Sequence, residues 1–292
     1  MYELNHIIGN SYYIQSPSKM GLVKLNDTDV CLIDSGNDKD AGRKVRRVLE
    51  AEGWVVKAIL NTHSHADHTG GNRYFQQNTG CKIFAPGIEA CIANHPVLEP
   101  ALLYGGAPCK ALRHKFLMAQ ESECHDITSP DFPAEIEIIP LHGHIFDMVG
   151  YRTPDDIVFL ADCVSSAATL EKYKIGYLYD VQAYLDTLDF VDTLSAKLFV
   201  PSHTEPTEDI HELTEINRRS VLEVQDKILS ICVEPMNFEA ILQRIFTDYA
   251  LTLNFEQYAL IGSTLRSYLS WLLDSGKLAV SFEDNMLLWK TV

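Results

Sequence analysis

Four residues able to bind a metal ion lie between residues 63 and 68 of the sequence. They are His63, His65, Asp67 and His68, and they follow an apolar run, residues 55–60, that is typical of a buried β-strand. Imidazole and carboxylate groups are common Zn²⁺ ligands in proteins. In an extended turn the first two side chains point to the same side, so one ion can take both. The other two lie on the next turn, and this spacing predicts a second ion nearby.

Candidate ligands also follow several other apolar runs, each where a strand would end. If these strands are neighbours, their ends converge on one rim, which is where the ligand sites of open sheets usually form. A structural role would explain any one of these residues alone, but together with the histidine-rich segment they predict a metal site. The residues are Asp34 after residues 30–33, His142 and His144 after residues 136–141, Asp162 after residues 158–161, and His203 after residues 198–201.

The ordered set of motifs resembles the metallo-β-lactamase-fold hydrolases over roughly residues 1–210. The segment HSHADHTGG, residues 63–71, is the most specific part of this resemblance. The resemblance implies an α+β fold, a four-layer αββα sandwich with a binuclear metal site between its two sheets. It also implies that Asp34 is an outer carboxylate that orients the metal-binding loop. Carried over by position, it implies the following ligands: His63, His65 and His144 on the first metal, Asp67, His68 and His203 on the second, and Asp162 bridging both.

The third motif contains two histidines, His142 and His144, which lie two residues apart and could face the same side of an extended chain. We expect His144 to be the ligand, because Gly143 before it and residues 149–151 after it keep the family's spacing. Two other positions depart from the family's pattern. Ala161 and Ser202 stand before Asp162 and His203 where the family commonly has glycine.

The expected activity is that of a metal-dependent hydrolase, in which a hydroxide bridging two metal ions attacks an ester, thioester or lactone of a small substrate. Asp67 is the expected catalytic carboxylate, supported by Asp34, and no G-x-S-x-G nucleophile motif is present. Two divalent ions are implied, with zinc expected from the ligand types and manganese or iron as alternatives. The alternative function is a metal-dependent ribonuclease acting on single-stranded RNA, because some members of the family cut RNA and carry a winged-helix-like tail.

The elements that would position these residues alternate between strands and helices, which indicates an α/β or α+β sandwich. We expect segment 87–130 to be an insertion that overhangs the site. The expected strands are residues 12–15, 21–24, 30–33, 55–60, 81–85, 136–141, 157–161 and 197–201, and the expected helices are about 38–52, 70–78 and 180–195.

The pattern becomes helical after about residue 207. Three expected helices, at about 208–232, 237–249 and 256–275, precede two short runs at 277–282 and 286–290, which is the order of elements in a winged helix. We therefore expect a catalytic domain over 1–215 and a helical, winged-helix-like module over 216–292. The module carries seven Lys and Arg against nine Asp and Glu, so packing or homodimerisation is expected of it rather than DNA binding.

The composition of the chain limits which classes of binding partner are expected. The 292 residues carry a formal net charge of −16, which repels phosphate backbones and argues against nucleic acid as a partner. The first twenty residues lack the apolar core of a signal peptide, and no window reaches the ~18 apolar residues of a membrane span. Seven cysteines at scattered positions do not indicate a disulfide framework. The expectation is a cytoplasmic protein that acts on a small molecule away from membranes.

Overall fold

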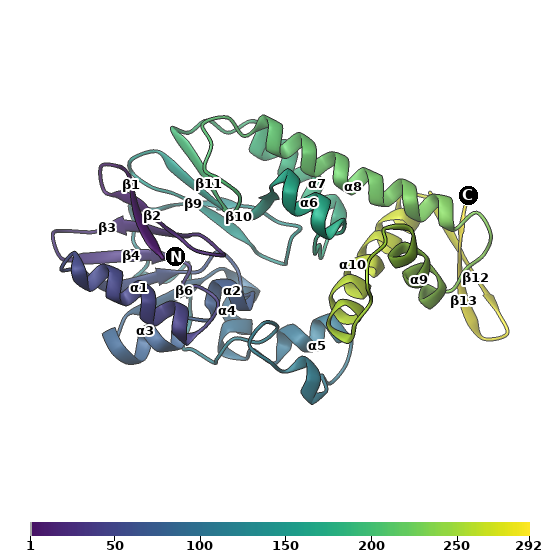
Figure 1. Ribbon diagram of the computed structural model, residues 1–292, viewed down its shortest axis with the longest axis horizontal. Helices are drawn as coiled ribbons and strands as arrows, with labels where there is room; N and C mark the ends of the chain where they lie inside the picture. The colour runs from purple at the N-terminus through teal and green to yellow at the C-terminus, as the bar shows by residue number, and fades with distance from the viewer. Residues whose placement is uncertain (1) are drawn as a thin grey trace.

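Two β-sheets packed face to face form the centre of the molecule (Figure 1). The structure is a computed structural model that describes residues 2–292. The first sheet has seven strands in chain order, and the second has four in the order β11-β10-β9-β8. The first contains β1 Glu3–Ile8, β2 Ser11–Gln15, β3 Met20–Lys24, β4 Asp29–Ile33, β5 Val55–Leu60, β6 Lys82–Ala85 and β7 His125–Asp126. The second contains β8 Glu137–Pro140, β9 Val149–Arg152, β10 Ile157–Ser165 and β11 Leu198–His203.

The strands that lead to the candidate ligands are buried on both faces along most of their length, although Val55 and Lys57 in β5 are exposed. β4 and β5 pair in parallel, and β10 pairs in parallel with β11. Because most of both faces is covered, these strands are mainly apolar rather than alternating. One apolar cluster fills the space between the sheets, with Leu60 and Phe84 from the first sheet meeting Tyr151 and Phe159 from the second.

Helices cover the outer face of each sheet (Figure 1). On the first sheet, α1 (Lys39–Ala51) begins at Asp38, whose carboxylate accepts a hydrogen bond from the Ala41 amide at 2.8 Å. α3 (Asn72–Thr79) lies beside it. On the second sheet, α7 (Val181–Asp192) and α8 (His211–Ile231) pack against β10. The order of layers is helix, sheet, sheet, helix, so the predicted α+β, four-layer αββα fold is confirmed.

The insertion between residues 87 and 130 reaches across to the C-terminal helices. It contains α4 (Gly87–Asn94), α5 (Leu98–Tyr104) and the short 3₁₀ helix η1 (Lys110–Leu112). α5 packs on α10, and a small apolar cluster joins Leu103, Leu112 and Leu117 to Ala259. The insertion and the C-terminal part therefore enclose one side of the molecule together.

The C-terminal part has three helices and then a hairpin. After α8 come α9 (Phe238–Asp248), α10 (Phe255–Asp274), β12 (Leu278–Glu283) and β13 (Met286–Thr291). A division at 215/216 stays a prediction; it would cut α8, and the apolar cluster on the second sheet continues from Ile139 to Leu278. Within residues 2–292, none of the helices has the length and apolar character needed to cross a membrane.

Candidate metal centre

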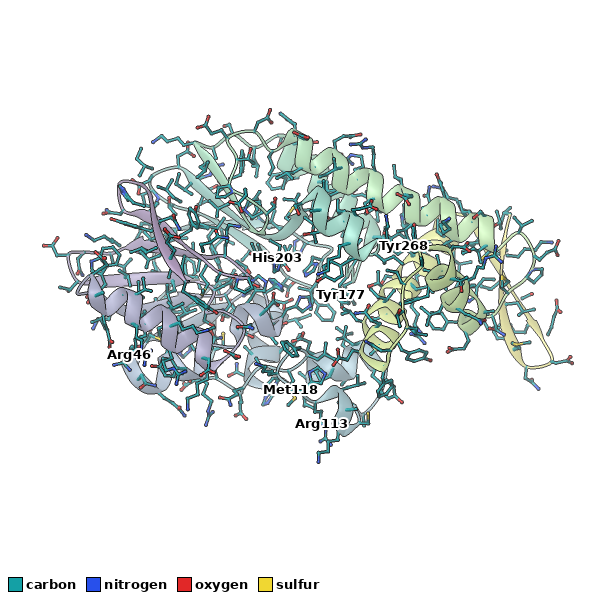
Figure 2. The ribbon with its side chains drawn as sticks, in the orientation of Figure 1. Arg46, Arg113, Met118, Tyr177, His203 and Tyr268 are labelled. Atoms are coloured by element: carbon teal, nitrogen blue, oxygen red, sulfur yellow. The ribbon has the colours of Figure 1, made fainter. Side chains whose placement is uncertain are left out.

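The candidate ligands converge at one edge of the sandwich, near the centre of the molecule. Asp34 follows β4, the His63–His68 segment follows β5, Asp162 lies within β10, and His203 ends β11. The short helix α2 (Ala66–Thr69) turns the chain directly after His65 and so separates the third and fourth donors of the segment from the first two. Figure 2 shows His203 and Tyr177 between the sheets and α10.

Two groups of donors form at this edge, and they share one residue. The first group is His63, His65, His144 and Asp162, and the second is Asp67, His68, Asp162 and His203. Within each group the donor atoms all lie within 4.8 Å of one another. All seven residues that the sequence singled out as ligands are present, and Asp162 belongs to both groups.

Three ring nitrogens converge in the first group. The Nδ1 atom of His65 lies 3.0 Å from Nε2 of His63 and 3.1 Å from Nε2 of His144. Asp162 Oδ2 lies 3.6 Å from the same nitrogen of His144. The three imidazoles pack edge to face, with ring centroids 4.6–5.2 Å apart. The arrangement directs three nitrogens and one carboxylate at a common point.

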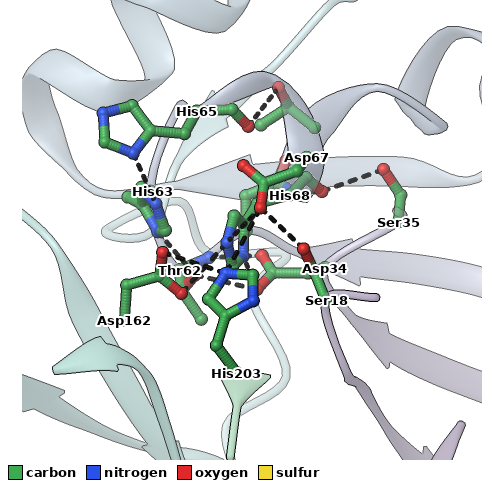
Figure 3. A network of polar contacts seen from close by, with 12 residues as sticks. Ser18, Asp34, Ser35, Thr62, His63, His65, Asp67, His68, Asp162 and His203 are labelled. Carbon is green, nitrogen blue, oxygen red and sulfur yellow. Dashed lines mark hydrogen bonds and ion pairs between the residues drawn. The ribbon is translucent and has the colours of Figure 1, made fainter. Parts of the chain in front are cut away.

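Carboxylates and imidazoles alternate in the second group (Figure 3). Nε2 of His68 lies 3.2 Å from Asp162 Oδ1 and 3.5 Å from Asp67 Oδ2. Nε2 of His203 lies 3.3 Å from a carboxylate oxygen of each acid. Asp67 is held in place by Ser18, whose hydroxyl donates to Oδ2 at 2.6 Å.

Hydrogen bonds on the far side of the rings determine which nitrogen faces the centre. Nδ1 of His144 lies 3.1 Å from the Tyr177 carbonyl, and Nδ1 of His203 lies 3.1 Å from the Pro17 carbonyl. A carbonyl only accepts, so in both rings Nδ1 carries the proton and donates. In the neutral ring Nε2 then presents its lone pair to the centre, which is the state that binds a metal.

Asp34 performs the same task for two more rings. Its Oδ2 accepts from Nδ1 of His68 at 2.8 Å and from the Thr62 hydroxyl at 2.8 Å. Since the Thr62 hydrogen is used there, its oxygen is left to accept from Nδ1 of His63 at 3.0 Å. Asp34 is only 2% exposed and belongs to neither donor group, so it orients the rings of both groups from behind.

His142 lies outside the centre. It is exposed, and its Nδ1 lies 3.0 Å from the Phe146 carbonyl. Gly143 turns the chain between the two histidines with a φ of +109°, which L side chains rarely adopt, and a Cβ there would lie 2.2 Å from the Tyr184 amide nitrogen. This turn directs His144 alone into the first group.

Burial keeps the first group neutral. It lowers the pKa of His63 well below the ordinary value, lowers the pKa of His65 to about 3, and lowers the pKa of His144. The neighbouring histidines add to this shift for His63 and His65, since a second positive charge beside the first is unfavourable. At neutral pH these nitrogens are therefore free of protons on the side that faces the centre.

The second group holds its charge as ion pairs. Asp162 raises the pKa of His203 to about 10. Burial alone would lower the pKa of His68, but Asp162, Asp67 and Asp34 raise it well above its ordinary value. Burial likewise opposes ionisation of Asp162, and His203 and His68 hold its pKa well below the usual range. The positive charges of protonated His68 and His203 thus balance the negative charges of Asp67 and Asp162, a task that a bound cation would otherwise perform.

The residues present fit divalent metal ions. His68 Nε2 and Asp162 Oδ1 are buried and form an ion pair at 3.2 Å, but neither atom has a hydrogen-bond partner among the described residues. Buried polar atoms without hydrogen bonds are costly, so the described side chains leave the bonding capacity of both atoms unsatisfied. Imidazole nitrogens and carboxylate oxygens aimed at two adjacent points are a donor set suited to Zn²⁺ and related ions.

Close backbone contacts fix the loop that carries the first histidines. A Cβ at Gly71 would lie 2.2 Å from the Ser35 carbonyl oxygen, so the second glycine of the HSHADHTGG segment allows this approach. Ala161 takes a φ of +50° immediately before Asp162, which explains why glycine is suited to this position.

Several supporting residues were missed by sequence reasoning. Glu89 is fully buried in α4 and accepts from the amides of Ser64 at 2.9 Å and Asp147 at 3.1 Å, which ties the ligand loops together. A single acid in the apolar stretch GIEACIAN was the available signal. Ser18 and the Tyr177 carbonyl had no such signal, because their roles depend on contacts distant in sequence.

A cleft of about 660 Å³ opens onto the centre. Asp67, His144, Asp162 and His203 form its floor. Its walls come from α6 (Ala167–Tyr173) with the turn that follows it and from α10, and they include Leu170, Lys172, Lys174, Ile175, Leu260 and Ile261. The helical module therefore contributes directly to the space in front of the donor groups.

A two-sheet sandwich with outer helices and a His/Asp centre at one edge defines a metal-binding class of αββα proteins. Comparison with known families identifies it further, since the model of the metallo-beta-lactamase superfamily matches residues 8–203. The chain belongs to the metallo-β-lactamase superfamily.

Solved structures share the fold over the whole chain. A beta-lactamase domain protein from Burkholderia ambifaria aligns with a TM-score of 0.73 at 14% identity, covering 99% of this chain and 94% of the other. A metallo-beta-lactamase family protein from Thermus thermophilus aligns with a TM-score of 0.68 at 16% identity, covering 100% and 98%. Both alignments include the C-terminal helices and hairpin.

Curated relatives match shorter segments. A hydroxyacylglutathione hydrolase from Maricaulis maris is 29% identical over 175 residues, which is 59% of this chain and 54% of the relative. One from Pseudomonas entomophila is 45% identical over 118 residues, which is 39% of this chain and 36% of the relative. This chain thus spans from about a third to about half of the length of these relatives.

Proposed function

We propose that the protein is a hydrolase that uses two divalent metal ions, zinc in the first instance, to cleave an ester or thioester bond of a small substrate. One observation carries the proposal: Asp162 belongs to both donor groups, so two ions held there would be neighbours. His63, His65 and His144 would hold one ion, Asp67, His68 and His203 the other, and Asp162 would contact both.

Such a pair of ions, when bound, acidifies water and polarises an acyl oxygen. The chain's own residues supply position and proton handling. Asp34 and the Tyr177 carbonyl keep the rings oriented, and Ser18 fixes one oxygen of Asp67. Asp67 is 39% exposed and lies on the cleft floor, where its carboxylate can accept a hydrogen bond from an attacking water.

The cleft supports a substrate of small-molecule size. Its volume is within the range of ligand pockets, and α10 limits its length on one side. Lys172 on its wall is suited to a substrate with a negative charge, whereas Lys174 is already paired with Glu171 at 2.6 Å. The relatives named hydroxyacylglutathione hydrolase make an acyl thioester the first class to test. The net charge of −16 argues against RNA.

The experiment compares substrates with and without metal. Zinc-loaded protein would be assayed on S-lactoylglutathione, on an aryl ester, on a lactone and on a labelled single-stranded oligoribonucleotide, and again after chelator treatment. We expect chelator-sensitive cleavage of the ester or thioester. His63→Ala should lose that activity, and His142→Ala, a matched change outside the centre, should keep it. Cleavage of RNA alone, or equal rates with and without bound metal, would contradict the proposal.

A further inference from the structure

The hairpin of β12 and β13 has one open edge. It projects from the helical module at the end of the molecule farthest from the α1 side of the sandwich (Figure 1). β13 pairs with β12 and, through a bridge between Trp289 and Met236, with the segment before α9. β12 pairs only with β13 among the described residues. Its outer side is therefore an unpaired strand edge.

The register shows which backbone groups face that edge. Trp289 exchanges backbone hydrogen bonds with Met236 at 2.8 and 3.0 Å, and the Thr291 amide donates to Cys232 at 2.8 Å. These two residues thus direct their groups away from β12. Their partners across the hairpin are Val280 and Leu278. In an antiparallel ladder, pairs whose groups point away from each other form no hydrogen bonds between them, so the N–H and C=O groups of Leu278 and Val280 point outward. Backbone direction alternates along a strand, so the same holds for every second residue and includes Phe282.

Most of the features that usually protect an edge strand are missing from β12. Natural edges are protected by charged residues, proline, bulges or short length, and the strand LAVSFE has no proline, has one charged residue, Glu283 at its end, and pairs with β13 in an unbroken register over six residues. Two apolar side chains on it are exposed, Val280 at 41% and Phe282 at 74%. An exposed, regular and apolar edge is a template for another strand.

We propose that β12 pairs with β12 of a second copy of this chain, antiparallel and centred on Val280, to give a symmetric homodimer with a continuous sheet. In this register Val280 lies opposite its own copy and Leu278 lies opposite Phe282. All of these residues direct backbone groups outward, and each such pair can exchange two hydrogen bonds.

Charge complementarity selects the same register. In this register Lys277 of each copy lies opposite Glu283 of the other copy, once on each side of the symmetry axis. Neither residue forms an ion pair within residues 2–292. Lys277 instead donates to the Gln225 amide oxygen at 2.7 Å, so its charge is not balanced by a carboxylate. A strand paired with its own copy in this register would balance both charges.

A second copy suits this edge better than nucleic acid does. The hairpin tip carries Glu283 and Asp284, which repel phosphates. Residues 216–292 have a net charge of −2, against −14 for the rest of the chain, so the module is also where two copies meet with the least repulsion. In Figure 1 the hairpin extends beyond the helices of the module.

The first test uses the mass of the full chain in solution, by analytical ultracentrifugation across a concentration series. The wild-type protein should approach twice 32.9 kDa. Val280→Pro removes an outward amide that the hairpin itself does not use, so it should give a monomer that keeps its circular dichroism spectrum and hydrolytic rate. Val280→Ile keeps that amide and should remain dimeric. A monomeric wild type, or a Val280→Pro variant that is still dimeric, would overturn the proposal.

The second test addresses the register. Glu283→Lys places two lysines opposite each other and should weaken the dimer, and adding Lys277→Glu should restore it. If the double variant stays as weak as the single variant, this register is wrong. Binding of a labelled oligoribonucleotide that Val280→Pro abolishes, with wild type monomeric, would assign the edge to nucleic acid instead.

Discussion

Oδ2 of Asp34 lies 2.8 Å from Nδ1 of His68, although the two residues come from different strand ends and only the histidine belongs to a donor group. The same oxygen accepts from Thr62, which in turn contacts His63. One buried carboxylate thus orients a ring in each donor group, and its removal should affect both.

Asp34→Ala should weaken metal binding at the centre by about 10–100-fold and lower activity correspondingly, because the ring orientation and tautomer of His68 are no longer fixed. The measurement is a competitive titration with a metal-binding dye. Asp27→Ala removes an exposed acid near the same sheet and serves as the control, with unchanged affinity expected. Equal affinities in the two variants would show that Asp34 has no orienting role.

His144→Ala should lose one metal ion per chain and reduce turnover by more than about 100-fold, since a direct ligand should matter more than the outer residues that orient it. His142→Ala is the matched change two residues away, and it should retain both metal and turnover because that ring is exposed. Elemental analysis of both purified variants makes the comparison. The reverse pattern would mean that the assignment of the third motif is wrong.

Gly143→Ala should lower the free energy of unfolding by about 1–3 kcal/mol or more, because the new Cβ meets the Tyr184 backbone and the residue has a positive φ. Gly106→Ala is the control, since nothing lies within 4 Å of a Cβ there. Urea unfolding of the two variants gives the difference. A Gly143→Ala protein as stable as wild type would contradict this account of the turn.

The metal-free protein should lose stability as pH rises. His203 has its pKa raised from about 6.5 to about 10 by Asp162, so the folded state binds this proton more tightly than the unfolded state does. The stabilisation is fully present below pH 6.5 and disappears as pH rises through about 10. Thermal unfolding of chelator-treated protein between these values should show the decline, and His203→Ala should reduce it, leaving the part that His68 contributes. An unchanged melting temperature in wild type would refute the ion pair.

Local patterns in the sequence predicted the sandwich, and they also marked out the residues that the fold brings together in the two donor groups. The segment from His63 to His68 is a compact motif, and β4, β5, β10 and β11 are mainly apolar because most of their side chains are buried. Helices α1, α9 and α10 begin where caps at Asp38, Asn237 and Asn254 accept amide hydrogen bonds. Such signals depend only on neighbouring residues.

The sequence analysis did not predict elements that lack a regular pattern of apolar residues. β1 is partly exposed and mixes polar and apolar residues, β9 has four residues including a glycine, and none of the residues of α6 is fully buried. The hydrogen bonds from Glu89, Ser18 and the Tyr177 carbonyl join residues that the fold alone brings together. Their partners are set by how the sheets and loops pack, which periodicity does not encode.

The number of metal ions bound per chain distinguishes a centre with a shared aspartate from any other arrangement of these donors. Purified protein would be stripped, reloaded with zinc, freed of excess ion and analysed for bound metal, alongside His65→Ala from the first donor group and His203→Ala from the second. We predict two ions in the wild type, one in each variant, and cooperative loss of both in Asp162→Ala. A single ion in the wild type, or two ions retained in Asp162→Ala, would contradict a centre built on a shared aspartate.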